Sequence, residues 1–348
     1  MESIKSSNLP GSPRSARIAL WGGIVFSVAF TVLIWWGAQR LVSVPHLPDQ
    51  GAAWYYWKLA TPTFWSHFTA WMFYALHQIA FWSLIFYAQT HVKTYSKGLH
   101  PVNVWALGVN AFFILLHFVQ TQLWYDGLAQ DVSIFSSQGS VILMLVAILL
   151  MENQRRGLFL GKKVSFAKQI GSFARKYHGY LFAWATVYTF WYHPMENTPG
   201  HLVGFLYMFL LLLQGSLFLT RIHVNKWWTL TQELAVGVHG TLVAIFQGQG
   251  LWPMFAFGFA GIFILTQMHG LGWNRRVRWL VAGLYVAAAL LIYSSRGWIQ
   301  LNEIIRIPLI EYLLVFVLAG LIALGLWISR SVRKQSSTVR LISDGKNI

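Results

Sequence analysis

Residues 18–40 read IALWGGIVFSVAFTVLIWWGAQR, and the only charged side chain in this stretch is Arg40 at its end. A helix needs about 20 apolar residues to cross the hydrocarbon core of a bilayer, which is about 30 Å thick. The run is longer than the apolar region of a typical secretory signal, and no cleavage pattern follows it. We therefore expect residues 18–40 to form a retained membrane-spanning helix.

Nine further stretches of similar character follow along the chain. They are residues 63–89, 102–124, 134–152, 179–193, 200–221, 227–247, 251–271, 277–295 and 308–330. Their connections are mostly short and leave no room for a second folded domain. The sequence therefore predicts an all-α, polytopic integral membrane protein with about ten transmembrane helices. Its parts are an N-terminal tail (1–17), one transmembrane domain (18–330) and a C-terminal tail (331–348).

The composition of the chain excludes several other classes of protein. Of its 348 residues, 56% are hydrophobic and 10% are charged, whereas about 25% of the residues of a soluble domain are charged. Because the sequence has no cysteine, it excludes disulfide scaffolds, thiolate metal centres and cysteine nucleophiles. It also has no HExxH, GxSxG or P-loop motif. Nucleotide-driven transport by this chain alone is therefore not expected.

The positive charges follow the pattern of a membrane topology. All but four of the 26 Lys and Arg residues lie in the tails and in alternate connections between the predicted spans. Cytoplasmic connections of membrane proteins are enriched in Lys and Arg. We therefore expect a multi-pass protein of the plasma (inner) membrane with both termini in the cytoplasm. The net charge of +16 then reflects topology, and no nucleic-acid partner is expected.

The connection 153–177 carries seven of these cations and no acidic residue. Within it, Phe166, Ile170 and Phe173 recur at helical spacing, so that one face is apolar and the rest is basic. This pattern is typical of a helix that lies on an anionic lipid surface. The alternative is that the connection serves only to fix the topology.

Three predicted spans each carry one histidine near mid-depth, namely His77, His117 and His239. Neutral imidazole is a common ligand of haem iron, copper and zinc, so these residues are candidates to hold haem b or a transition-metal ion. The alternative is that each bonds to a neighbouring helix. His178 and His269, at the cytoplasmic ends of their spans, would form a second ligand pair.

The connection at 193–201 reads HPMENTPGH. Pro194 is expected to end one helix, and Thr198 is expected to cap the next. These roles leave three residues unexplained at a membrane surface: His193, Glu196 and His201. They are candidates to bind a metal, to relay protons, or to contact a quinone or a lipid head group, and a solvated turn is the alternative.

These residues suggest two main functions. In the first, the protein is a membrane-bound oxidoreductase or related enzyme that acts near the outer face. Its candidate catalytic acids are Glu196 and Glu233, and its candidate metal ligands are His193, His201 and His117. In the second, it is a secondary transporter or channel for a small solute or metal ion, which uses Glu233 and the mid-depth histidines.

A third hypothesis is a lipid-modifying enzyme or an assembly subunit without a redox cofactor. The expected partners are the lipid bilayer, anionic lipid at residues 153–177, and a quinone or another membrane subunit.

Overall fold

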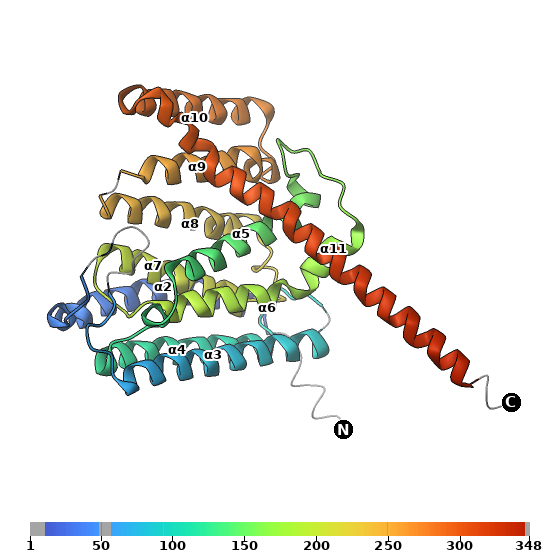
Figure 1. Ribbon diagram of the computed structural model, residues 1–348, viewed down its shortest axis with the longest axis horizontal. Coiled ribbons are helices and arrows are strands. Elements are labelled where there is room, and N and C mark those ends of the chain that lie inside the picture. The colour runs from blue at the N-terminus through green and yellow to red at the C-terminus, as the bar shows by residue number, and fades with distance from the viewer. Residues whose placement is uncertain (1–10, 49, 51–56, 93, 249, 345–348) are drawn as a thin grey trace.

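The structure, a computed structural model, describes residues 11–48, 50, 57–92, 94–248 and 250–344. The chain is 79% helical, and its described residues contain no β-strand. They form ten α-helices: α2 (Pro13–Gly37), α3 (Phe64–His91), α4 (Pro101–Trp124), α5 (Ile134–Arg156), α6 (Lys168–Tyr192), α7 (Pro199–Ser216), α8 (Lys226–Phe246), α9 (Trp252–Leu265), α10 (Arg275–Arg296) and α11 (Glu303–Asp344). Figure 1 shows α2–α10 running back and forth as one bundle, while α11 crosses the bundle obliquely and extends beyond it.

The helices support a helical membrane protein. Seven of them are long and apolar enough to cross a membrane, namely α2, α4, α5, α7, α8, α10 and α11. The other three predicted spans are also helical, but they do not meet this criterion. Helix α9 has only 14 residues, while α3 and α6 are long enough but too rich in polar and aromatic side chains. Of the ten predicted spans, seven thus correspond to helices that meet the criterion for crossing a membrane.

The helix ends agree with the capping signals in the sequence. Helix α6 ends at Tyr192, two residues before Pro194, and α7 begins at Pro199. The Thr198 hydroxyl accepts a hydrogen bond from the backbone N–H of His201 at 3.3 Å, so the predicted cap is confirmed. At the C-terminus, most of the predicted tail is helical, because α11 continues to Asp344.

The structure differs from the predicted surface helix within residues 153–177, because part of this segment is the beginning of a longer helix of the bundle. Ile170 and Phe173 belong to α6, which runs without a break from the basic connection into the bundle. Ile170 is buried, and Phe166 packs against Phe316 of α11. Phe166 and Ile170 therefore pack against protein, whereas Phe173 is 39% exposed. No helix breaker separates Lys168 from the apolar part of α6, so the helix is continuous.

The two ends of the bundle differ in character. We name the end that carries residues 125–133 and 193–198 the histidine end, and the end that carries residues 157–167 and 217–225 the basic end. At the histidine end, the last turn of α6 is fully buried: Phe190, Trp191 and Tyr192 are each 0% exposed. This turn packs in the main hydrophobic core and gives the connection that follows it a rigid starting point.

Polar side chains on one face of α4, which follow one another at intervals of seven residues, join this helix to its neighbours. Asn103 Nδ2 donates to the carbonyls of Ser216 (2.9 Å) and Phe218 (2.8 Å). Asn110 Nδ2 donates to Ser216 Oγ at 2.8 Å, and its Oδ1 accepts from His77 Nε2 at 2.8 Å. Because lipid offers no hydrogen bonds, these contacts fix how α3, α4 and α7 pack.

The substitution Asn110→Leu should destabilise the bundle, because it leaves His77 Nε2 and Ser216 Oγ buried without these partners. The expected loss is about 2–4 kcal/mol in the free energy of unfolding, measured by denaturant titration in detergent. The matched control is Gln39→Leu, since Gln39 is an exposed amide. Equal stability of the two variants would contradict the role assigned to Asn110.

Candidate functional site

Two of the three mid-depth histidines have both ring nitrogens engaged. His77 Nδ1 accepts from Trp191 Nε1 at 3.1 Å, while its Nε2 donates to Asn110. His117 Nε2 donates to the carbonyl of His193 at 2.8 Å, and its Nδ1 lies 3.0 Å from Gln120 Oε1. These contacts match the alternative in which each histidine bonds to a neighbouring element, and they do not fit ligation of haem by either ring.

His239 lies apart from these two rings, on the face of α8 that meets α7. Its ring is 6.3 Å from that of Tyr207, and a side-chain carbon placed on Gly204 would lie 3.1 Å from its Nε2. The lack of a side chain at Gly204 thus makes room for the imidazole. Within the described residues, no group of three or more His, Asp or Glu side chains is arranged to hold a metal ion.

The predicted second ligand pair has other contacts at the basic end. The ring of His178 lies 6.2 Å from that of His223, while His269 Nδ1 accepts from Arg278 Nη1 at 2.9 Å. The second nitrogen of His269 donates to the carbonyl of Ile264 at 3.1 Å. His178 is therefore next to His223, and His269 is next to a cation.

The residues 193–201 bring the predicted outer group together. The rings of His193 and His201 are 5.3 Å apart, and Trp57 packs edge-on against His201 at 4.4 Å. His201 Nδ1 is 2.8 Å from the hydroxyl of Thr198. This pair of imidazoles lies where α6 ends and α7 begins.

Glu196 of the same connection ends a chain of hydrogen bonds that starts at His46. His46 Nε2 lies 2.7 Å from the Tyr125 hydroxyl, and this hydroxyl donates to Glu196 Oε1 at 2.5 Å. His46 is half-buried, whereas Tyr125 and Glu196 are 5% and 4% exposed. The three residues therefore connect the surface with a buried carboxylate, and we call them the relay.

The backbone around the relay is unusual in two places. Tyr125 has a φ of 41°, a left-handed conformation that costs a residue other than glycine about 1–3 kcal/mol. A side-chain carbon at Gly127 would lie 2.4 Å from the carbonyl oxygen of Tyr192, so only glycine lets residues 125–131 approach the end of α6. This approach brings Tyr125 next to Glu196.

Burial changes the acid–base properties of the relay. It raises the pKa of Glu196 above its usual value, and the hydrogen bond from Tyr125 opposes this rise. Burial also lowers the pKa of His46, so this imidazole is neutral at pH 7. A carboxyl with a raised pKa keeps its proton to a higher pH than an exposed carboxyl does, so it can act as a general acid over a wider range of pH.

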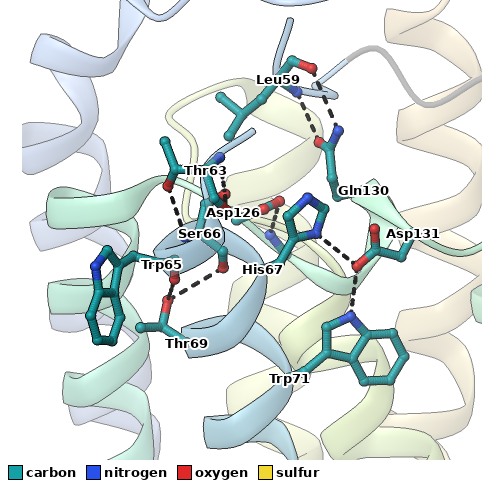
Figure 2. Close-up of polar contacts among 11 residues, drawn as sticks. Leu59, Thr63, Trp65, Ser66, His67, Thr69, Trp71, Asp126, Gln130 and Asp131 are labelled. Atoms are coloured by element: carbon teal, nitrogen blue, oxygen red, sulfur yellow. Dashed lines mark hydrogen bonds and ion pairs between the residues drawn. The ribbon is translucent and has the colours of Figure 1, made fainter. Parts of the chain in front are cut away.

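A second polar group joins the start of α3 to residues 126–131 (Figure 2). Asp131 Oδ2 accepts from Trp71 Nε1 at 2.7 Å and lies 3.0 Å from His67 Nδ1. Asp126 is buried next to Ser66 and His67, and its Oδ1 accepts from the backbone N–H of Gly127 at 2.8 Å. Burial raises the pKa of Asp126 to about 6.

Glu233 lies in a different polar centre, towards the basic end. Its Oε1 accepts from Arg156 Nη1 at 3.0 Å, and its Oε2 accepts from Gln267 Nε2 at 2.9 Å. Arg156 Nη2 is 2.8 Å from Glu233 Oε2, and both side chains are almost completely buried. Glu233 is therefore bonded to two neighbouring elements, the end of α5 and the segment that follows α9.

Sequence reasoning missed three of the residues that make these contacts. Arg156 is one of seven cations in a connection and has no feature that distinguishes it from the rest. His46 and Tyr125 each lie far along the chain from Glu196, and neither belongs to a recognisable motif.

Comparison with protein-family models, with curated proteins and with solved structures finds no match.

Asp126 should make stability depend on pH. Its pKa in the folded protein is about 6 against a usual 3.8, so the folded state binds more protons between these values and loses stability as pH rises through them. The Asp126→Asn variant lacks this titration. Its free energy of unfolding, relative to the wild type, should rise by about 2–3 kcal/mol between pH 4 and pH 7.

The value at pH 4 is the internal control, because Asp126 is then protonated and uncharged, as asparagine is. A difference between variant and wild type that stays constant from pH 4 to pH 7 would contradict a raised pKa for Asp126.

Proposed function

We propose that this chain is a membrane enzyme that transfers protons to or from a substrate at the histidine end of the bundle. The observation that carries the proposal is the relay, in which a half-buried histidine is joined through a tyrosine hydroxyl to a buried carboxylate. The His193–His201 pair next to it supplies two further groups that donate or accept protons. General acid–base catalysis needs such groups within hydrogen-bond reach of one another.

The relay has a defined direction. Tyr125 donates to Glu196, so the Tyr125 oxygen accepts from His46 Nε2–H. A proton that enters at His46 Nδ1 is passed on when Nε2–H moves to Tyr125 and the tyrosine proton moves to Glu196. In this proposal Glu196 is the general acid or base that faces the substrate, and His46 exchanges protons with water.

Haem b or a transition metal, expected from the sequence, has no assigned step in this proposal. The ring nitrogens of His77 and His117 are engaged elsewhere, and the described residues hold no three-ligand group of His, Asp or Glu. A reduced-minus-oxidised absorption spectrum of the purified protein tests this part. Sharp bands in the reduced state would favour a haem oxidoreductase, whereas proton transfer alone requires no haem and predicts no such bands.

The proposal includes a membrane topology of ten spans with both termini in the cytoplasm. It is supported by the alternation of positive charge along the sequence and by the back-and-forth course of α2–α10 (Figure 1). In this topology the basic end faces the cytoplasm, where residues 153–177 meet anionic lipid. The relay and the two histidines then lie at the outer face of the plasma (inner) membrane.

The topology can be tested without background labelling, because the chain has no cysteine. Ser43 is exposed at the histidine end and Lys163 is exposed at the basic end. We expect a membrane-impermeant maleimide to label Ser43→Cys in intact cells and Lys163→Cys only after the cells are permeabilised. The reverse pattern would invert the topology, and labelling of both residues in intact cells would refute ten spans.

The activity can be tested without knowing the substrate. Cells that produce the wild-type protein should contain a membrane or outer-side compound with an altered mass, found by untargeted mass spectrometry. Glu196→Gln and Tyr125→Phe should lower its amount at least about 100-fold, because they remove a proton acceptor and the link to it. The matched controls are Glu152→Gln and Tyr95→Phe, which lie at the basic end and should leave the compound unchanged.

Two results would contradict the proposal. Equal loss in the relay variants and the controls would show that the compound does not depend on the relay. Movement of an unaltered solute across the membrane, without any new mass, would favour the secondary transporter or channel. For that function, Glu233 would have to leave its bonds to Arg156 and Gln267 to carry a proton or ion.

A further inference from the structure

A groove runs between α5, α8 and α9, away from the histidine end. Its volume is about 490 Å³, within the range of about 300–1,000 Å³ that is typical of small-molecule sites. Most of its wall is apolar and includes Leu145 and Ile148 of α5, Leu242 of α8, and Ala256 and Ala260 of α9. The groove therefore accommodates a hydrocarbon chain.

One end of the groove is polar. Arg156, Glu233 and Gln267 line it there, and they form the buried centre described above. Thr241 lies two helical turns along α8 from Glu233, and its hydroxyl donates to the carbonyl of Gly237. The groove thus combines one polar end with a long apolar body, which is the shape of a lipid with a small head group.

Three buried polar atoms at this end form no hydrogen bond within the part of the chain that the structure describes, namely Arg156 Nε, Arg156 Nη2 and Gln267 Oε1. Arg156 Nη2 forms an ion pair with Glu233 Oε2 at 2.8 Å, which leaves Arg156 Nε, a donor, and Gln267 Oε1, an acceptor, without a polar partner. The orientation of the Gln267 amide is fixed, because its nitrogen must face the Glu233 carboxylate. Buried polar groups in proteins are nearly always paired, so these two atoms point to a ligand that both accepts and donates.

The charges of the polar end define the ligand further. The positive charge of Arg156 is already balanced by Glu233 at 2.8 Å. An anionic head group would add an unbalanced negative charge to a buried, low-dielectric site, and a cationic one would add an unbalanced positive charge. A carbonyl or an ether accepts from Arg156 Nε but has no proton for Gln267 Oε1. A hydroxyl group meets both requirements and carries no charge.

We propose that this groove binds a neutral lipid with a hydroxyl head group, such as a long-chain alcohol, with the hydroxyl at Arg156 and Gln267 and the chain along α8. Access is available from the side, since Leu234 and Val238 line the groove and are also 39% and 56% exposed. On the surface of a membrane protein, such residues face the hydrocarbon region. The ligand therefore enters from the bilayer and not from water.

The test uses a diazirine-bearing hexadecanol as a photoreactive probe on the full-length protein in detergent. We expect crosslinked peptides from α5, α8 and α9. Ala260→Phe fills the groove and should reduce crosslinking at least about tenfold, whereas Ala287→Phe, on the exposed face of α10, should leave it unchanged. Label found equally on both variants, or mainly on α10, would overturn the site.

Competition with wild-type protein tests the head group and does not depend on the folding of a variant. Unlabelled hexadecanol should compete at a concentration about tenfold lower than its methyl ether, which has no proton for Gln267 Oε1. Gln267→Met should abolish this difference. Stronger competition by palmitate than by hexadecanol would overturn the neutral head group and assign an anionic lipid.

This inference does not rest on the proposed function. Photolabelling of Glu196→Gln should equal that of the wild type, because the relay lies in a different part of the bundle. Loss of the altered compound together with normal photolabelling would therefore support both proposals. Normal photolabelling without any altered compound would support the lipid site in the groove and contradict the proposed enzyme activity.

Discussion

A lipid bilayer offers no hydrogen bonds, so a polar side chain buried in this bundle depends on a partner within the protein or on a bound ligand. This constraint explains the contacts that join the helices. Asn110 links α3, α4 and α7 through His77 and Ser216, and Arg156 links α5 to α8 through Glu233. Each link is a direct hydrogen bond between two side chains, so it forms only when the two helices have the correct rotation about their axes and the correct shift along them.

The same constraint decides how much of the fold the sequence could predict. Length and apolar content are properties of each helix alone, so all ten predicted ranges correspond to helices. Asn103, Asn110 and His117 follow one another at intervals of seven residues, so they share one face of α4, and all three are buried against protein. The start of α6 was predicted less well, since the basic residues before it resemble a surface segment until the contact of Phe166 with Phe316 of α11 is known.

The candidate site was harder to predict, because its residues meet only through the packing of distant segments. Glu196 was singled out from its local surroundings, but its partners Tyr125 and His46 precede it by 71 and 150 residues. Tyr125 is one of 14 tyrosines, and no property of the sequence distinguishes it. Its left-handed backbone and the close approach at Gly127 exist only in the folded chain.

The two buried acids differ in the groups that balance them, and this difference separates their roles. Glu233 faces a guanidinium that is always charged, so neutralising the carboxylate would leave Arg156 buried without its counter-ion. Glu196 bonds to a neutral hydroxyl and, among the described residues, forms no ion pair. Protonation of Glu196 therefore leaves no buried counter-ion uncompensated. This difference supports the proposal that protons are transferred at the histidine end, and it is consistent with the neutral ligand proposed for the groove beside Glu233.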